Sequence, residues 1–296
     1  MTKIWVTRPG DEPNLPSVEA EAARLQAEIG AIEALGNPSA CCICGRQAAL
    51  TVEHAPSKRA GNVGPMIRGM IDDVASSTVG AVRWQTERTY GATYETLCAT
   101  CNNHTGSWYN PAYVRFVRLA APFAQPKNAG NVCRFDVTVH RQRVAKQAIA
   151  SFAATSQPGL TEKYPVLREL LLNRTEQQPI APLHLWLYLR ANRGGMTTGL
   201  TVSLKLEQRK GHLVAGFAFW PLGWLLTVGD IDTDDNVINV SSWTELDYNN
   251  KTPVAIAIPC QWAVSPYPGD FRSPAEIAGE AWTVGGPPSG TGSPLP

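Results

Sequence analysis

Two cysteine pairs of the form Cys-x-x-Cys are the residues of this chain best suited to chemistry. They are Cys41 with Cys44, and Cys98 with Cys101. A tight turn brings the two thiolates of each pair together, so two pairs supply the four ligands of one tetrahedral Zn²⁺. The sequence therefore predicts a structural zinc site that joins two segments far apart in the chain.

Acid, amide and imidazole side chains stand beside both pairs. Glu53 and His54 follow the first pair, and Asn102 and His104 follow the second. A zinc site would bring these four side chains into one small space. Hydrolysis of a phosphodiester needs a base that deprotonates water and positive charge at the leaving oxygen, which one histidine and one divalent cation supply. The pattern thus indicates metal-dependent phosphodiester chemistry.

The order of these pieces resembles the HNH endonuclease family, which has the ββα-metal or His-Me finger fold. The resemblance lies within residues 40 to 110, in Cys41-Cys42-Ile43-Cys44, in Leu50 to Pro56 and in Leu97 to Asn102. It implies a zinc-clipped unit in which one strand ends in Glu53-His54. A second strand then leads into the second cysteine pair and a helix. The resemblance also implies hydrolysis of DNA, with His54 as the general base.

Oxygen donors near the histidine are predicted to hold a catalytic Mg²⁺ or Mn²⁺, because hard cations prefer oxygen ligands. Glu53 and Asn102 are the preferred ligands, and His104 is the alternative to Asn102. Residues two apart on a helix face different ways, so both would not bind one ion. Where relatives in the family carry an asparagine before the second pair, this chain has Thr93, and Asn62 is the alternative source of that residue.

The composition is that of a globular protein, with 296 residues, 44% hydrophobic and 17% charged. No apolar run reaches the roughly 18 residues of a membrane span, and the first residues lack the apolar segment of a secretory signal. We therefore expect a cytoplasmic protein that does not enter a membrane, in which paired cysteines bind metal. Cys133 and Cys260 are expected to be buried thiols. Cys42 is an alternative to Cys41, but only Cys41 gives the two-residue gap to Cys44.

Charge is unevenly distributed along the chain, although the net charge is only +1. Residues 111–210 hold fifteen Lys and Arg against five Asp and Glu, whereas residues 211–296 hold two against nine. The basic stretch either forms a positive surface beside the zinc site, as phosphate contacts require, or is simply the solvated face of the fold. The segment before the second cysteine pair adds four basic candidates for phosphate contact: Lys58, Arg59, Arg68 and Arg83.

Periodicity and composition divide the chain into four predicted parts. These are an N-terminal arm and helix (1–36), a zinc-bound HNH nuclease domain (37–130), an α+β recognition or partner domain (131–284) and a disordered tail (285–296). Ser17 is the predicted cap of a helix over 17–35, whose apolar stripe packs on the zinc domain or, alternatively, forms a dimer.

The predicted fold class is α+β, in which the second domain has a mainly antiparallel sheet. Strands are expected at 49–52, 94–97, 183–189, 200–206, 213–219, 220–228, 237–240 and 254–258, and further helices at 108–116, 144–153 and 162–172.

Two functions follow from the sequence. The first is a Zn-stabilised endonuclease that hydrolyses DNA with Mg²⁺ or Mn²⁺, in bacterial or phage defence by analogy. The second is a non-catalytic, zinc-stabilised module that binds nucleic acid or protein. Expected partners are DNA or RNA, and a second protein or second copy of the chain bound through the C-terminal domain or the helix over 17–35.

Overall fold

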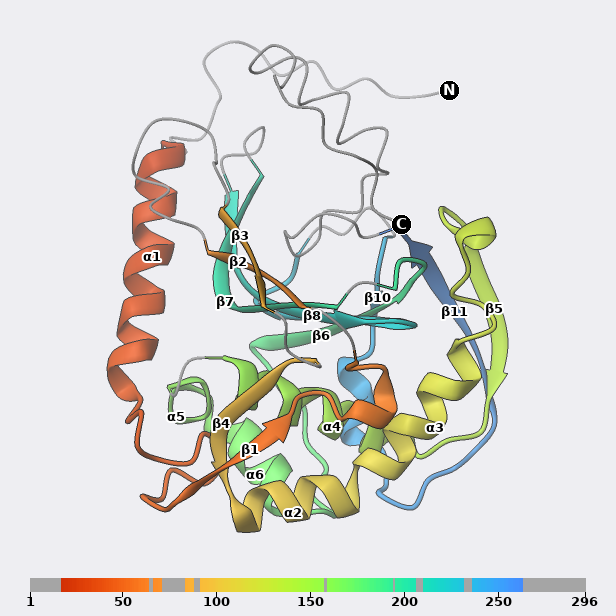
Figure 1. The fold of residues 1–296 in the computed structure, drawn as a ribbon, viewed down its shortest axis with the longest axis horizontal. Helices are drawn as coiled ribbons and strands as arrows, with labels where there is room; N and C mark the ends of the chain where they lie inside the picture. Colours follow the sequence, from red (N-terminus) through yellow and green to blue (C-terminus); the bar gives the residue numbers. More distant parts are fainter. Residues whose placement is uncertain are drawn as a thin grey trace.

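The computed structural model of the chain shows helices packed against a mainly antiparallel sheet, an α+β fold (Figure 1). It describes residues 17–63, 66–70, 83–87, 91–156, 159–193, 195–205, 210–231 and 236–262. The predicted arm before Ser17 and the predicted tail over 285–296 lie outside the described residues. Within the described residues, no helix combines the length and apolar character that crossing a membrane requires.

The large sheet contains seven strands. Its order is β5 (Val132–Val137), β11 (Val254–Gln261), β6 (Leu183–Arg190), β9 (Leu222–Val228), β8 (Lys210–Phe219) and β7 (Met196–Lys205), and β10 (Ile238–Asn239) pairs with β6. All of these neighbours are antiparallel except β11 and β6, which run parallel. The predicted mainly antiparallel sheet is therefore confirmed, with β5 as an additional edge strand.

Helix α1 (Val18–Leu35) begins where the sequence predicts. The Ser17 hydroxyl accepts a hydrogen bond from the Ala20 amide at 3.1 Å, which satisfies an amide that the first turn leaves unpaired. The apolar stripe of Leu25, Ile29 and Ile32 is buried, and the helix packs mainly on β7, β8 and the short helix α5 (Leu160–Lys163). The expected packing on the zinc domain was wrong in this respect, because the sheet covers this stripe.

Helix α4 (Arg141–Thr155) lies at the centre of the molecule, where it packs against elements on both sides. These elements are β4 (Thr93–Cys98), α2 (Ala99–Trp108), α3 (Asn110–Ala120), α6 (Pro165–Leu172), β7, β8 and the short helix η3 (Ser241–Glu245). Most of its residues are buried. A single cluster of buried apolar residues therefore runs from the cysteine-rich segment to the large sheet.

The cysteine-rich segment is a pair of antiparallel strands followed by a helix. Strand β1 (Leu50–His54) pairs with β4, and α2 (Ala99–Trp108) begins within the second cysteine pair. The helix predicted at 108–116 thus starts earlier and is divided in two, since α3 begins after Tyr109. Between β1 and β4 lie the short helix η1 (Lys58–Ala60) and a two-stranded sheet of β2 (Met66–Met70) and β3 (Arg83–Glu87).

Candidate metal centre and adjoining site

The four cysteines of the two pairs come together as the sequence predicts. The sulfur atoms of Cys41, Cys44, Cys98 and Cys101 all lie within 4.8 Å of one another, and those of Cys44 and Cys98 are 3.9 Å apart. Tetrahedral zinc with Zn–S bonds of about 2.3 Å separates its sulfurs by about 3.8 Å. The donor set and spacing therefore fit a structural zinc ion. Within the described part of the chain, no other group of three or more His, Cys, Asp or Glu side chains is close enough to share an ion.

Backbone hydrogen bonds bring the two cysteine pairs together. The Cys42 amide donates to the Thr96 carbonyl at 2.9 Å, which fixes the first pair beside the end of β4. The first pair closes as a tight turn in which the Gly45 amide donates to the Cys41 carbonyl at 2.8 Å. Gly45 has φ +72°, a conformation that glycine adopts without steric cost. In the second pair, Cys98 caps α2 and Cys101 lies in its first turn.

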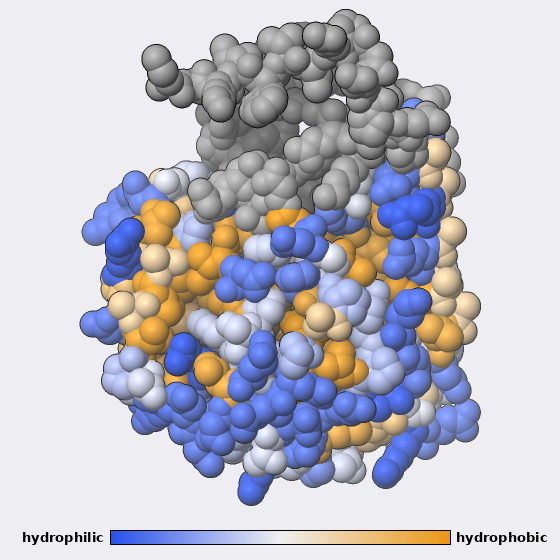
Figure 2. Space-filling model, turned by 180° about the vertical axis from the view of Figure 1, so that it is seen from behind, coloured by the Kyte–Doolittle hydropathy of each residue, from blue (hydrophilic) through white to orange (hydrophobic). Residues whose placement is uncertain are grey.

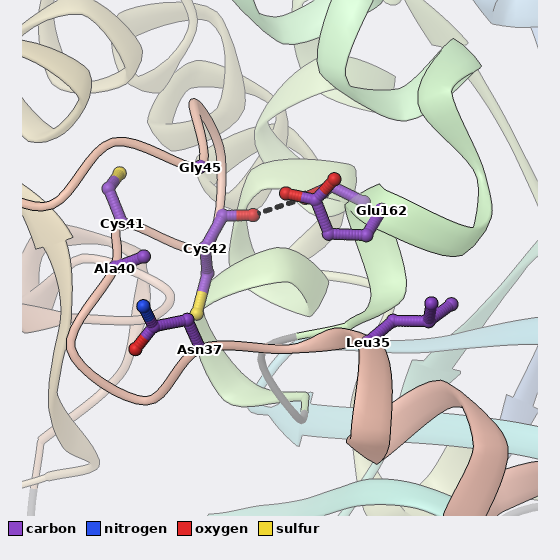
Figure 3. Close-up of a pocket in the computed structure, with 8 residues that line it drawn as sticks. Leu35, Asn37, Ala40, Cys41, Cys42, Gly45 and Glu162 are labelled. Atoms are coloured by element: carbon purple, nitrogen blue, oxygen red, sulfur yellow. Dashed lines mark hydrogen bonds between the residues drawn. The ribbon is translucent and has the colours of Figure 1, made fainter.

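The first cysteine pair is also held from behind by residues of the second half of the chain. The Thr161 hydroxyl donates to the Cys42 carbonyl, and the Arg168 guanidinium donates to the Ile43 carbonyl at 3.0 Å. Figure 3 shows this region and the small cavity beside it, with the sulfurs of Cys41 and Cys42 pointing in opposite directions. The cavity measures about 50 Å³, enough for a few water molecules, so it is too small to be a substrate pocket.

The ionisation of the thiols distinguishes Cys41 from its neighbour. A hydrogen bond from the Cys101 thiol lowers the pKa of Cys41 below its ordinary value. Burial raises the pKa of Cys42 to about 12. The sulfur of Cys41, and not that of Cys42, belongs to the group of four sulfurs that could share one ion. Cys41 is therefore the candidate ligand, as the two-residue gap predicts.

One face of the β1–β4 pair carries the predicted cation ligand Glu53. The two strands pair from Leu50 opposite Cys98 to His54 opposite Thr93, with Thr96 as one extra residue on β4. Strand β1 is uninterrupted, so Thr51 and Glu53 point to the same side. The Thr96 hydroxyl donates to the Glu53 carboxylate at 3.2 Å and lies 2.9 Å from the Ala154 carbonyl of α4. This face is therefore the inner one.

Asn102 meets the same face from α2. Its side-chain amide donates to the Thr51 hydroxyl at 3.0 Å. Thr51 and Glu53 are successive inward-pointing residues of β1. Asn102 contacts Thr51 and therefore lies on the same side of β1 as Glu53. Burial raises the pKa of the Glu53 carboxyl to about 8, although the hydrogen bond from Thr96 acts in the opposite direction. Because a carboxyl with this pKa is mostly protonated at neutral pH, Glu53 would have to lose a proton before it could bind Mg²⁺ or Mn²⁺.

His54 is the last residue of β1, and the chain leaves the strand directly after it. It is half-buried and, by strand alternation, starts on the opposite face from Glu53. The loop after it is fixed by the fully buried Asn62. The Asn62 side chain donates to the carbonyls of Pro56 at 2.7 Å and Ala92 at 2.9 Å, and accepts from the Ala92 amide at 2.6 Å. Asn62 therefore ties the loop beyond His54 to the start of β4.

The remaining candidate site residues lie on α2 and in the segment between β1 and β4. His104 faces away from Asn102 on α2 and stacks on the Trp108 ring, with 4.2 Å between ring centroids. Lys58 and Arg59 are exposed on η1. Arg68 and Arg83 occupy paired strands, in which Arg68 lies opposite Gln85 and Arg83 opposite Met70. The structure thus leaves two predicted basic residues exposed directly after His54.

Comparison with known proteins adds no family to this description. No protein-family model matches the chain, and neither a curated protein nor a solved structure is significantly similar to it. The site therefore has to be argued from its own residues.

Two polar residues of the site carry no signal in the sequence. Thr51 and Thr96 contact Asn102 and Glu53 respectively, but the sequence pattern assigns a role to neither of them. Only the strand register, in which Thr96 is the extra residue, shows that they line the same face.

Proposed function

We propose that this protein is a zinc-stabilised, metal-dependent endonuclease of the HNH type that hydrolyses phosphodiester bonds in DNA. One observation carries the proposal. A four-cysteine cluster fixes two antiparallel strands and a helix, and this frame puts Glu53 and Asn102 on one side of the strand that ends in His54. The order of elements is the one that the resemblance to HNH enzymes implies.

In this proposal His54 takes a proton from the attacking water, because histidine is the side chain most often used as a general base near neutral pH. Asn62 holds the loop that follows His54 and so limits the positions that the imidazole can adopt. A bound Mg²⁺ or Mn²⁺ would supply positive charge for the leaving oxygen. Glu53 and Asn102 would hold that ion, which requires that Glu53 lose its proton and that the His54 side chain turn toward the inner face where the strand ends. Lys58 and Arg59, exposed beside the same loop, attract the phosphate backbone.

A second candidate is a zinc-stabilised binding module without catalysis. Two observations favour it. Thr93 stands where the family carries an asparagine, and the Asn102 amide is already engaged by Thr51. In this case the cysteine cluster would serve only to hold the strands and α2 together, and the surface of the molecule would bind the partner.

Plasmid nicking with added Mg²⁺ or Mn²⁺ separates the two candidates. His54→Ala should lower the cleavage rate by roughly 10² to 10⁴, the usual effect of removing a general base, while zinc content and DNA affinity stay near wild type. His184→Ala is a matched control, since His184 lies on β6 beside Asn239. No cleavage by the wild-type protein with either ion would favour the binding module. Equal cleavage rates for wild type and His54→Ala would show that His54 is not the general base.

A further inference from the structure

A tyrosine beyond the end of α2 is contacted by two arginines. The Arg143 guanidinium lies 3.8 Å from the centroid of the Tyr248 ring, and that of Arg174 lies 5.8 Å from it. Arg143 also donates to the Tyr248 carbonyl at 3.0 Å and to the Asn249 side chain at 2.9 Å. A close cation–π contact and two neutral acceptors therefore position the Arg143 guanidinium, whereas the exposed Arg174 makes the longer of the two ring contacts.

Neither guanidinium is neutralised by a carboxylate in the described part of the chain. The ion pairs found there join Arg24 to Glu21 and Glu28, and Arg168 to Glu162. Three carboxylates in the neighbouring segments, Asp247, Glu176 and the exposed Glu245, keep their negative charge, but none of them forms an ion pair with either guanidinium. Asp247 accepts from the Gln177 side chain and the Asn249 backbone, and Glu176 from the Asn173 side chain. Arg143 and Arg174 thus keep their positive charge available to a partner.

A further positive group, Lys251, is exposed near this pair. Arg143 itself lies in the first turn of α4, where the helix dipole adds partial positive charge. Burial lowers the pKa of His140, and so do the charges of Arg143 and Lys251. These three groups therefore lie close to one another. Seen from behind, hydrophilic residues cover much of the lower part of the molecule, where the helices lie (Figure 2).

This basic cluster adjoins the helix of the candidate site. The Tyr248 hydroxyl donates to the Trp108 carbonyl at 3.2 Å, at the last residue of α2. Helix α2 has 10 residues and so spans about 15 Å from the zinc centre to this point. Since DNA rises about 3.4 Å per base pair, the interval corresponds to roughly four base pairs.

We propose that Arg143 and Arg174, held against Tyr248, bind the phosphate backbone of a nucleic acid whose path continues along α2 from the candidate site. A guanidinium presents several N–H donors in a plane that matches a phosphate, and cation–π contact fixes that plane in advance. The neighbouring exposed side chains, Asn249 and Gln177, are amides that hydrogen-bond to phosphate or sugar. The inference rests on the proposed function for the identity of the ligand.

Binding of a labelled 20-base-pair duplex, measured by fluorescence anisotropy without added Mg²⁺ over a range of salt concentrations, tests this proposal. Each phosphate contact contributes about 0.9 to the slope of log affinity against log salt. Arg143→Gln combined with Arg174→Gln should lower the slope by nearly two and the affinity about tenfold or more. The Lys double variant at the same positions should retain most of the slope.

Arg24→Gln with Lys163→Gln is the control, because it removes the same charge from α1 and α5. It should leave both the slope and the affinity near wild type. Zinc content and urea unfolding report whether each variant is folded.

The outcomes separate this proposal from the nuclease proposal. An unchanged slope in a folded Arg143→Gln/Arg174→Gln variant overturns the basic cluster, even if the wild-type protein cleaves DNA. An equal loss of salt slope and affinity in the Arg24→Gln/Lys163→Gln control also overturns the proposal, because binding would then depend only on net charge. The proposal is also overturned if the wild-type protein does not bind the duplex, or if it binds vesicles containing phosphatidylserine instead. Binding through both arginines without cleavage supports the cluster and counts against the nuclease.

Discussion

The sulfur atoms of Cys44 and Cys98 lie 3.9 Å apart although 54 positions separate the two residues in the chain. A contact between such distant thiols closes a long loop, and without a metal it offers only weak S–H interactions in return. A bound zinc ion would provide that stabilisation. The arrangement of β1, β4 and α2 should therefore depend on the metal.

The first prediction concerns that dependence. Purified protein should contain about one tightly held zinc per chain, and removal of the zinc should unfold the cysteine-rich segment, because structural zinc binding is coupled to folding. Cys98→Ser should give zinc-free or insoluble protein. Cys260→Ser is the matched control, since Cys260 is also buried but lies on β11, away from the cysteine cluster. Metal analysis and circular dichroism measure both effects, and equal tolerance of the two substitutions would exclude the site.

The second prediction concerns the tie made by Asn62. Asn62→Ala removes three hydrogen bonds in a fully buried position and leaves the Pro56 carbonyl and the Ala92 backbone without a partner. Each unsatisfied buried group costs about 1–3 kcal/mol, so the free energy of unfolding should fall by roughly 3 kcal/mol or more. Urea unfolding measures the loss, with the exposed Asn103→Ala as control.

Gly91 offers an independent check on the same tie. Its φ is +93°, and an added Cβ would stand 2.4 Å from the Asn62 side-chain oxygen and 2.5 Å from the Asn62 backbone oxygen. Gly91→Ala should therefore lower the free energy of unfolding, and most of that loss should persist in the Asn62→Ala background, because the backbone contact and the positive φ remain. A loss that disappears in the double variant would show that the side-chain contact alone matters.

The third prediction concerns the catalytic cation. Glu53→Gln and Asn102→Ala should raise the Mg²⁺ concentration needed for half-maximal cleavage, because both side chains lie on the inner face of β1. Two neighbours serve as controls. Glu95 is exposed on β4, and His104 stacks on Trp108, so Glu95→Gln and His104→Ala should change that concentration far less. A larger effect from His104 than from Asn102 would show that the other face of α2 carries the ligand.

Much of the fold can be predicted from local pattern. Helix α1 combines a Ser17 cap with an apolar stripe at helical spacing, so its limits follow from the sequence. Strand β5 has period-2 alternation over six residues, which is long enough to predict a strand, so its absence from the expected strands is a missed prediction rather than a limit of local pattern. The start of α2 is hidden for a different reason. Thr100, Asn102, Asn103 and Gly106 are poor helix formers, so packing around the cysteine cluster, rather than propensity, places its first turn.

The candidate site, like the fold, is only partly predictable from the sequence. The cysteine pairs are predictable because their spacing alone specifies the geometry of a zinc ligand set. The shared face of Glu53 and Asn102 depends on the extra residue Thr96, and a bulge of this kind is set by the pairing of strands far apart in sequence. The Tyr248 contacts with Arg143 and Arg174 join segments with no motif between them.

The last prediction concerns Lys146, a fully buried lysine on α4. Its ammonium group donates to the carbonyls of Asn173 at 3.0 Å and Arg174 at 3.1 Å. Burial lowers the pKa of Lys146 to about 8, against a smaller raising effect of Glu176. The folded pKa therefore lies below the value of about 10.4 in the unfolded chain. Between these two values the unfolded chain holds the proton and the folded chain has lost it. This group thus makes the protein more stable as pH rises from about 8 to about 10.

Replacing the lysine removes that pH dependence. The free energy of unfolding of Lys146→Met should drop increasingly below that of the wild type as pH rises from about 8 to about 10, by at most roughly 3 kcal/mol. Below about pH 8 both states of the wild type hold the proton, so the difference between the two proteins should be constant there. Urea unfolding at pH 7, 8, 9 and 10 measures the difference, and the exposed Lys163→Met provides the baseline for other titrating groups. A difference independent of pH over the whole range would show that the Lys146 ammonium has an ordinary pKa despite its burial.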